Sequence, residues 1–256
     1  MFNQTQSIFD GQLTRSPYYK NLLGSMSQLK KNQSLRLLMD TFFLLVHIAF
    51  GSVALLAAAL AFLTKKGPKF HAKVGRVYAL AMIGVGLTAG ALWWLGSTDF
   101  LLFIAFFSTY MVLVGWRLGQ NRKGSVGNID QALVGVGIIG TLGLLFISLD
   151  IAFWDEEASF AIVPLVFSFI CGSLTYFQRL SLKSGKAPRG KERIRLHGIF
   201  MGAGTISTVT AFSLTAIGSG IVIWLLPTAI GSALITYNLG GLRSGSVQIP
   251  SNSESA

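Results

Sequence analysis

Seven long apolar stretches constrain the fold of this chain more than any other feature of its sequence. They run approximately over residues 38–64, 74–95, 98–118, 129–153, 159–180, 195–217 and 219–242. A helix needs about 20 apolar residues to cross the hydrocarbon core of a bilayer, whereas the strands of a membrane barrel alternate in polarity over about ten. Because these stretches are continuously apolar, we expect an all-α, polytopic transmembrane bundle of about seven spans.

The composition favours a membrane protein over a soluble one. Only 12% of the residues are charged and 52% are hydrophobic, whereas a soluble domain carries about 25% charged residues. The net charge of +11 would suit nucleic acid on a soluble surface, but here the basic residues border apolar stretches, where they meet anionic lipid heads. We therefore expect the lipid bilayer as a partner and no nucleic acid. Protein partners and the oligomeric state are left open.

The basic residues alternate from loop to loop. Sixteen of the 21 Lys and Arg residues lie in or beside every second loop, counting the C-terminal tail, and the loops between them carry only acidic charges. By the positive-inside rule the basic loops and the C-terminus are cytoplasmic, in the inner (plasma) membrane. Seven spans then place the N-terminus outside, although residues 1–37 contain five basic residues that would have to be translocated. The side of the N-terminus is therefore open.

The domain organisation has three parts. Residues 1–37 are a polar N-terminal segment, in which residues 17–30 form either an amphipathic helix on the membrane surface or a solvated leader. Residues 38–243 form the seven-helix transmembrane domain, and residues 244–256 a disordered tail rich in Ser and Asn. We expect no cleavable signal peptide, because the polar segment lacks a short apolar core.

Three histidines, His47, His71 and His197, are the best candidates for a functional site. Each lies in or at the edge of an apolar stretch, where an ionisable group is costly unless it has a partner or a task. At 1.5 Å per residue, His71 and His197 lie within roughly one helical turn of a basic loop, whereas His47 lies about 25 Å from its loop. His71 and His197 can therefore meet at the cytoplasmic face, and His47 cannot join them.

Small residues share the helix face of His47. Gly51, Ala54 and Ala58 fall at helical spacing from it, and such a stripe packs against another helix more readily than it faces lipid. We therefore expect His47 to point into the bundle.

The first candidate site is a cytoplasm-facing pocket built by His71, Arg76, Tyr78 and His197, which would bind haem b or a quinone-like redox ligand. Two imidazoles on facing helices are the usual axial ligands of b-type haem. Its propionates would meet nearby basic side chains, namely Lys73, Arg76, Arg193 and Arg195. The alternative is that each histidine only hydrogen-bonds a backbone carbonyl or a lipid phosphate. Three histidines at two depths do not supply the converging ligands of a zinc site, so no such metal site is expected.

Two further patterns have both a functional and a packing interpretation. Gly135, Gly137 and Gly140 spell the dinucleotide pattern GxGxxG, but at mid-membrane depth they favour close helix approach instead. The fifth stretch carries a polar seam, which either lines a passage or hydrogen-bonds to neighbouring helices. The seam consists of Ser168, Gly172, Thr175 and Arg179. No nucleophile motif is present, so the sequence does not say whether the protein is an enzyme.

The segments HIAFGSVALL, KFHAKVGRVYAL and RIRLHGIFMGAG resemble those of a bacterial family of multi-pass membrane proteins of unknown function. The matching positions are His47, His71, Gly75, Arg76, Tyr78 and His197. The resemblance covers about residues 40–240 and implies the fold and a bacterial inner membrane, but no activity; Ala72 stands where members commonly carry Arg. A fainter resemblance is to transmembrane b-type cytochromes, which use four histidines. This chain has three, so at most one haem is expected.

Three hypotheses about function follow. The first is the redox-ligand site at His71 and His197. The second is a transporter or lipid-handling protein that uses the polar seam and kinks at Pro164 and Pro227. The third is a non-catalytic assembly or scaffold subunit.

Overall fold

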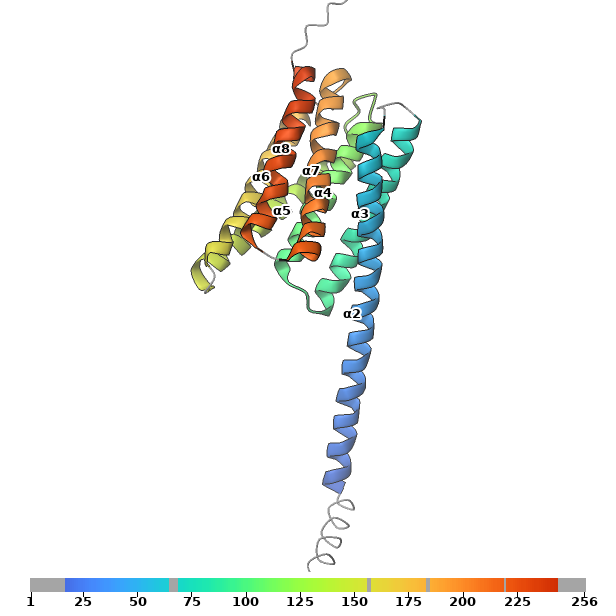
Figure 1. The fold of residues 1–256 in the computed structure, drawn as a ribbon, viewed down its shortest axis with the longest axis vertical. Coiled ribbons are helices and arrows are strands. Elements are labelled where there is room, and N and C mark those ends of the chain that lie inside the picture. The colour runs from blue at the N-terminus through green and yellow to red at the C-terminus, as the bar shows by residue number, and fades with distance from the viewer. Residues whose placement is uncertain (1–16, 65–68, 156–157, 183–184, 219, 244–256) are drawn as a thin grey trace, which may run out of the picture. The chain divides into compact units, whose positions relative to one another are not determined.

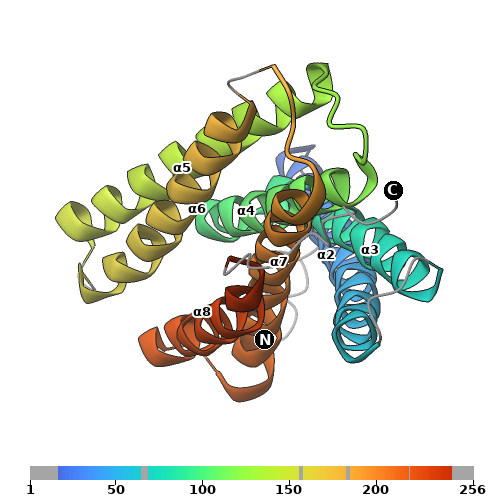
Figure 2. The same cartoon turned by 90° about the horizontal axis from the view of Figure 1, so that it is seen from above.

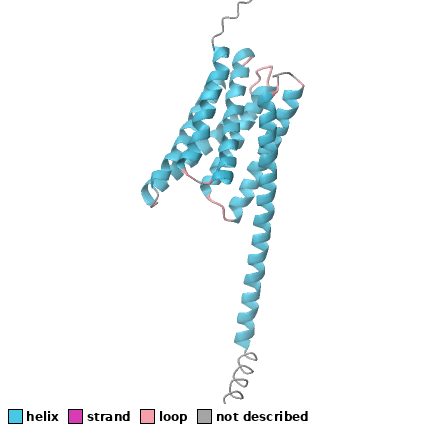
Figure 3. Cartoon of the chain, in the orientation of Figure 1, coloured by secondary structure: helices cyan, strands magenta, loops and turns pink. Residues whose placement is uncertain are grey.

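The computed structural model describes residues 17–64, 69–155, 158–182, 185–218 and 220–243. Within these ranges the chain is helical and contains no strand (Figure 3). The α-helices are α2 (Pro17–Leu63), α3 (Phe70–Leu95), α4 (Asp99–Gln120), α5 (Asn128–Trp154), α6 (Ile162–Leu182), α7 (Gly190–Ile217) and α8 (Ile221–Arg243), and a 3-10 helix, η1 (Ala158–Ala161), precedes α6. The predicted all-α bundle is confirmed. The expected disordered tail, residues 244–256, lies outside the described residues.

Six segments of the described chain are long and apolar enough to cross a membrane. They are Gln28–Leu63, Phe70–Leu95, Asp99–Gln120, Asn128–Trp154, Ala158–Leu182 and Ile221–Leu239. The protein therefore has the character of a multi-pass membrane protein. The predicted span at residues 195–217 corresponds to α7, which does not meet the same criterion of length and hydropathy. This helix packs against both α4 and α8, and it buries hydroxyl side chains such as Ser207 and Thr210. A helix covered by neighbours does not need an apolar surface on every side.

The chain divides into two compact units, residues 1–46 and 47–256. In the first unit, the helix starts at Pro17 and runs without interruption through residue 37, where the sequence predicted a boundary between a polar segment and the first span. Apolar side chains from Leu37 onward are exposed, among them Leu38 and Phe42. Such a surface suits contact with lipid.

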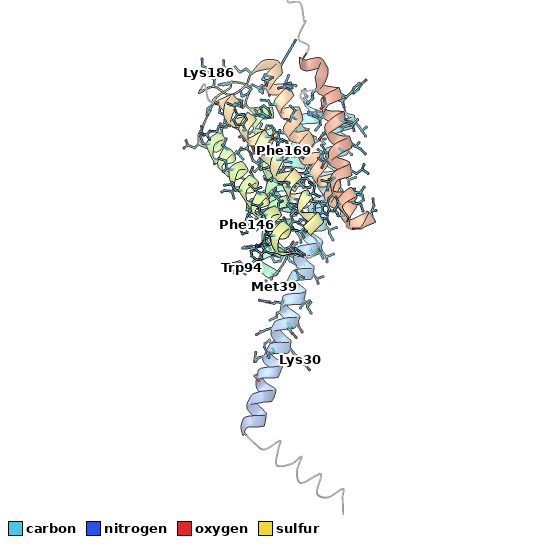
Figure 4. The ribbon with its side chains drawn as sticks, turned by 90° about the vertical axis from the view of Figure 1, so that its left-hand side faces the viewer. Lys30, Met39, Trp94, Phe146, Phe169 and Lys186 are labelled. Carbon is cyan, nitrogen blue, oxygen red and sulfur yellow. The ribbon has the colours of Figure 1, made fainter. Side chains whose placement is uncertain are left out.

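In the second unit, α4 lies at the centre of the bundle. It packs against α3, α5 and α7, while α6 packs on α5 and α8 packs on α7 (Figures 1 and 2). The core contains fully buried Tyr110, Phe167 and Phe200. Large apolar side chains also cover the outside: Figure 4 labels Phe146 on α5 and Phe169 on α6, which are 70% and 75% exposed. Apolar side chains inside and outside are what a bundle surrounded by lipid requires.

One end of the second unit gathers the basic loops. We call it the basic end and define it by residues 69–76, 117–128 and 179–195. The backbone N–H of Ala187 donates to the carbonyl oxygen of Gly124 at 3.0 Å, and Arg193 Nη1 donates to the carbonyl oxygens of Leu118 and Gly119 at 3.0 and 2.8 Å. The first bond ties the loop before α7 to the loop after α4, and the other two tie the first turn of α7 to the end of α4.

The two prolines at which kinks were expected occupy different positions within their helices. Pro227 lies inside α8, but α6 begins at Ile162, so Pro164 occupies its first turn. A first-turn N–H has no partner within the helix, so a proline there is tolerated without a kink. Pro164 therefore gives no reason to expect a kink in α6.

Candidate functional site

His71 and His197 come together at the basic end. His71 is the second residue of α3, and His197 lies in the second turn of α7. Their ring centres are 6.3 Å apart and their ring planes are nearly perpendicular, at 83°. The start of α3 and the start of α7 thus bring two imidazoles, far apart in the sequence, to one place.

The ring of His197 is oriented by α4. Its Nδ1 lies 2.7 Å from the carbonyl oxygen of Gly115, and because a carbonyl only accepts, Nδ1 must be the donor. Gly119 allows this approach, since a side-chain carbon there would lie only 3.0 Å from the ring. A histidine that donates one ring N–H to a backbone carbonyl is held in one tautomer and orientation, which is the usual arrangement for a metal-binding imidazole.

The ring of His71 has a different environment. Its Nδ1 is buried and has no hydrogen-bond partner among the described residues. A buried polar atom without a partner costs about 1–3 kcal/mol. This nitrogen is therefore an atom that a bound molecule could satisfy.

Tyr78 lies on the same face of α3 as His71, about 10 Å deeper in the bundle at 1.5 Å per residue. It is only 1% exposed, and its hydroxyl oxygen lies 3.4 Å from Thr208 Oγ1 on α7. Tyr78 therefore joins α3 to α7 below the two histidines and does not contact their rings.

Arg76 does not join the pair. Five residues after His71, it lies about 140° around the helix, and its side chain is exposed. Two of the other basic residues expected to hold propionates are already engaged, because Arg193 donates to carbonyls of α4 and Arg195 pairs with Glu192 at 3.1 Å. Lys73 is exposed like Arg76.

His47 lies far from this pair. Its Nδ1 is 2.9 Å from Thr88 Oγ1, and Thr88 lies about 25 Å along α3 from His71 at 1.5 Å per residue. The small residues on the face of His47 include Ala54 and Ala58, which are 0% and 5% exposed and pack with residues of α3. The bond between His47 and Thr88 joins α2 to α3, so His47 has a packing role here.

The polar seam of α6 faces its neighbouring helices. Ser168 Oγ donates to the carbonyl oxygen of Thr141 at 2.9 Å, and Thr175 Oγ1 donates to Tyr110 Oη at 3.0 Å. Tyr110 in turn donates to Gln178 Oε1 at 2.7 Å. Ser168 and Thr175 therefore serve hydrogen bonding between helices, and these contacts do not favour a passage lined by the seam.

The glycines of the GxGxxG pattern serve helix packing to different degrees. A methyl group at Gly137 would collide with the side chains of Thr175 and Tyr110, and one at Gly140 would lie 3.6 Å from Cys171 Sγ. A methyl at Gly135 would meet nothing within 4 Å. Of these three glycines, Gly137 is therefore the one at which close packing excludes a side chain.

An ion pair between Arg117 and Asp130 was not predicted from the sequence. Arg117 Nε and Nη2 donate to Asp130 Oδ1 and Oδ2, both at 2.9 Å, and the N–H of Gly127 donates to Asp130 Oδ2 at 2.8 Å. Asp130 borders a small cavity that also touches Gln178. The sequence did contain a signal, because Asp130 is an acidic residue in the first turn of a helix that follows a basic loop.

The described ranges contain no group of three or more His, Cys, Asp or Glu residues that could hold a metal ion. His71 and His197 are only two residues and so do not form such a group, but two histidines are enough to hold a b-type haem.

Comparisons with known proteins give no further guide. The chain matches no model of a protein family, no curated protein and no solved structure. The resemblances to a bacterial membrane family and to b-type cytochromes therefore stay predictions from the sequence.

Proposed function

We propose that this multi-pass membrane protein binds a redox ligand between His71 and His197, and that the ligand is haem b. The 6.3 Å separation of the two ring centres carries the proposal. His71 and His197 would hold such a haem, because two imidazoles on facing helices are its usual ligands. In the structure the two rings pack edge to face, within the range of ordinary contacts between aromatic rings.

The surroundings of the pair support this ligand in one further respect. The carbonyl oxygen of Gly115 accepts a hydrogen bond from His197 Nδ1 and so orients the ring, as a backbone carbonyl usually orients a ligand histidine. A porphyrin ring is wide, so the first turn of α3 and the second turn of α7 would have to move apart for His71 and His197 to hold it.

The role that follows is electron transfer. A haem held by both His71 and His197 would supply one-electron transfer, because the two histidines would occupy the positions at which oxygen could bind. By the positive-inside rule the basic end would face the cytoplasm, and the resemblance to a bacterial membrane family implies that the membrane is the inner membrane. The protein would then receive or deliver electrons at the cytoplasmic face.

A visible difference spectrum tests the proposal. The protein is purified from haem-replete membranes, and its dithionite-reduced spectrum is compared with the oxidised one. We expect a b-type spectrum for the wild type and for His47→Ala, and its loss in His71→Ala and in His197→Ala. A purified wild-type protein without a Soret band would refute haem binding.

A quinone is the second candidate, and the unpaired His71 Nδ1 favours it. A quinone carbonyl accepts a hydrogen bond, which would satisfy this nitrogen, and its single ring needs less separation of α3 and α7 than a porphyrin does. Extraction of the purified protein into organic solvent would then release about one quinone per chain from the wild type and much less from His71→Ala. Equal amounts from the two proteins would exclude this ligand at His71.

The transporter and scaffold hypotheses have no comparable observation in their favour. Ser168 and Thr175, which a passage would need, hydrogen-bond to Thr141 and Tyr110.

A further inference from the structure

A groove lies between α5 and α6 at the basic end, away from the two histidines. It is open to the outside and has a volume of about 520 Å³, within the roughly 300–1,000 Å³ typical of small-molecule sites. The first two turns of α5 and the last two turns of α6 supply its lining residues, which are Gln131, Val134, Tyr176, Arg179, Leu180 and Leu182.

The polar part of the groove is basic. Arg179 is exposed and forms no ion pair with the described carboxylates, because the salt bridges in the described ranges are those of Arg117 with Asp130 and of Arg195 with Glu192. Asp130, the acidic residue nearest along α5, is thus neutralised by Arg117. An anion in the groove would meet an uncompensated guanidinium, and the side-chain amide of Gln131 would supply a neutral donor beside it.

The remaining lining is apolar and continues along the outer surface of both helices. Val134 and Leu182 form the buried wall of the groove, and Tyr176 and Leu180 are 60% and 45% exposed at its rim. Tyrosine is enriched where the head groups of a bilayer meet its hydrocarbon core. Farther from the basic end, exposed Phe146 and Phe169 extend the apolar surface along α5 and α6 (Figure 4).

We propose that this groove binds one anionic phospholipid. Its phosphate contacts Arg179 and Gln131, and its acyl chains lie along the apolar side chains of α5 and α6. Charge complementarity favours an anionic head group over a zwitterionic one, because the groove offers a positive charge and no described negative partner. Basic pockets between transmembrane helices on the cytoplasmic side are a recurrent form of lipid recognition. The site is independent of any ligand at His71 and His197.

Lipid titration of the purified protein tests the proposal. The full chain in mild detergent is titrated with phosphatidylglycerol or with phosphatidylcholine of the same acyl chains, and the thermal unfolding midpoint and the lipid retained in native mass spectra are recorded. We expect phosphatidylglycerol to bind and to raise the midpoint, and phosphatidylcholine to do so much less. Arg179→Gln should weaken phosphatidylglycerol binding about fivefold, the effect of about one basic residue at a membrane surface.

Two variants separate this site from general surface charge. Arg122→Gln removes the same charge from an exposed position of the basic end outside the groove, and it should leave binding unchanged. Arg179→Lys keeps the charge, so it should retain the preference for phosphatidylglycerol even if Arg179→Gln fails to fold. Equal losses in Arg122→Gln and Arg179→Gln, no loss in either, or equal stabilisation by inorganic phosphate would overturn the proposal.

Discussion

Arg117 on α4 and Asp130 on α5 form a two-point ion pair at the basic end, with both N–O distances at 2.9 Å. Asp130 is almost fully buried, with 6% of its side chain exposed, whereas 26% of the Arg117 side chain is exposed. The pair joins the end of one helix to the start of the next and also receives the N–H of Gly127. It therefore fixes the turn between α4 and α5.

Removing the carboxylate charge of Asp130 should destabilise the protein. Loss of one partner of a fully buried ion pair costs about 3–5 kcal/mol, and the partial exposure of Arg117 reduces the expected cost of Asp130→Asn to about 2 kcal/mol. Unfolding in a titration of denaturing detergent measures this cost. Glu192→Gln, which breaks the exposed pair with Arg195, is the control and should change the unfolding free energy by less than about 0.5 kcal/mol. If Asp130→Asn and Glu192→Gln lowered the unfolding free energy by similar amounts, the stabilising role given to the buried Asp130 carboxylate would be wrong.

Two glycines of the GxGxxG pattern should respond differently to alanine. Gly137→Ala pushes a methyl group into Thr175 and Tyr110, and overpacking of this kind costs about 1–3 kcal/mol. Gly135→Ala meets nothing within 4 Å, so we expect no loss of stability. The two unfolding free energies, measured in the same detergent, provide the comparison. If both variants lost the same stability, the close approach of α6 and α4 at Gly137 would be refuted.

The hydrogen bond between His47 and Thr88 should contribute modestly to stability. Interhelical hydrogen bonds in membrane proteins average about 0.6 kcal/mol and reach about 1.7 kcal/mol. A double-mutant cycle with His47→Ala and Thr88→Ala should therefore give a coupling free energy in this range. Strictly additive effects of the two substitutions would show that the contact is not formed in the membrane.

The fold was largely predictable, because each apolar stretch is long enough to span a bilayer and the turns between stretches are short. The relation of His71 to His197 could be anticipated in the same way, since depth along a helix follows from residue number and both residues border basic loops. His47 was placed at a different depth by the same arithmetic, and its partner Thr88 is indeed far along α3 from His71.

Other features depend on rotation and packing, which residue spacing along one helix does not determine. Arg76 matched the motif of the candidate pocket but lies on another side of α3 from His71. Asp130 could be paired with Arg117 only once α4 and α5 were placed side by side. The boundary expected at residue 37 rested on a change in polarity, and a helix can continue through such a change.

The orientation of the bundle can be tested by cysteine labelling. The native Cys171 is buried, so it should not react, and single cysteines can be introduced at exposed Lys123, at the basic end, and at exposed Ala158, at the opposite end. In intact spheroplasts an impermeant maleimide should label Ala158→Cys and not Lys123→Cys, because basic loops stay in the cytoplasm. After the membranes are opened, both should react. Labelling of Lys123→Cys in intact spheroplasts would reverse the proposed orientation.

The most direct test of the account is the ligand content per chain of four purified proteins: the wild type, His71→Ala, His197→Ala and His47→Ala. Haem and extractable quinone are quantified in each sample. We predict that one of these ligands is present at about one per chain in the wild type and in His47→Ala, and that it is lost in the two other variants. Neither ligand in the wild type, or equal content in all four proteins, would contradict a redox site between His71 and His197.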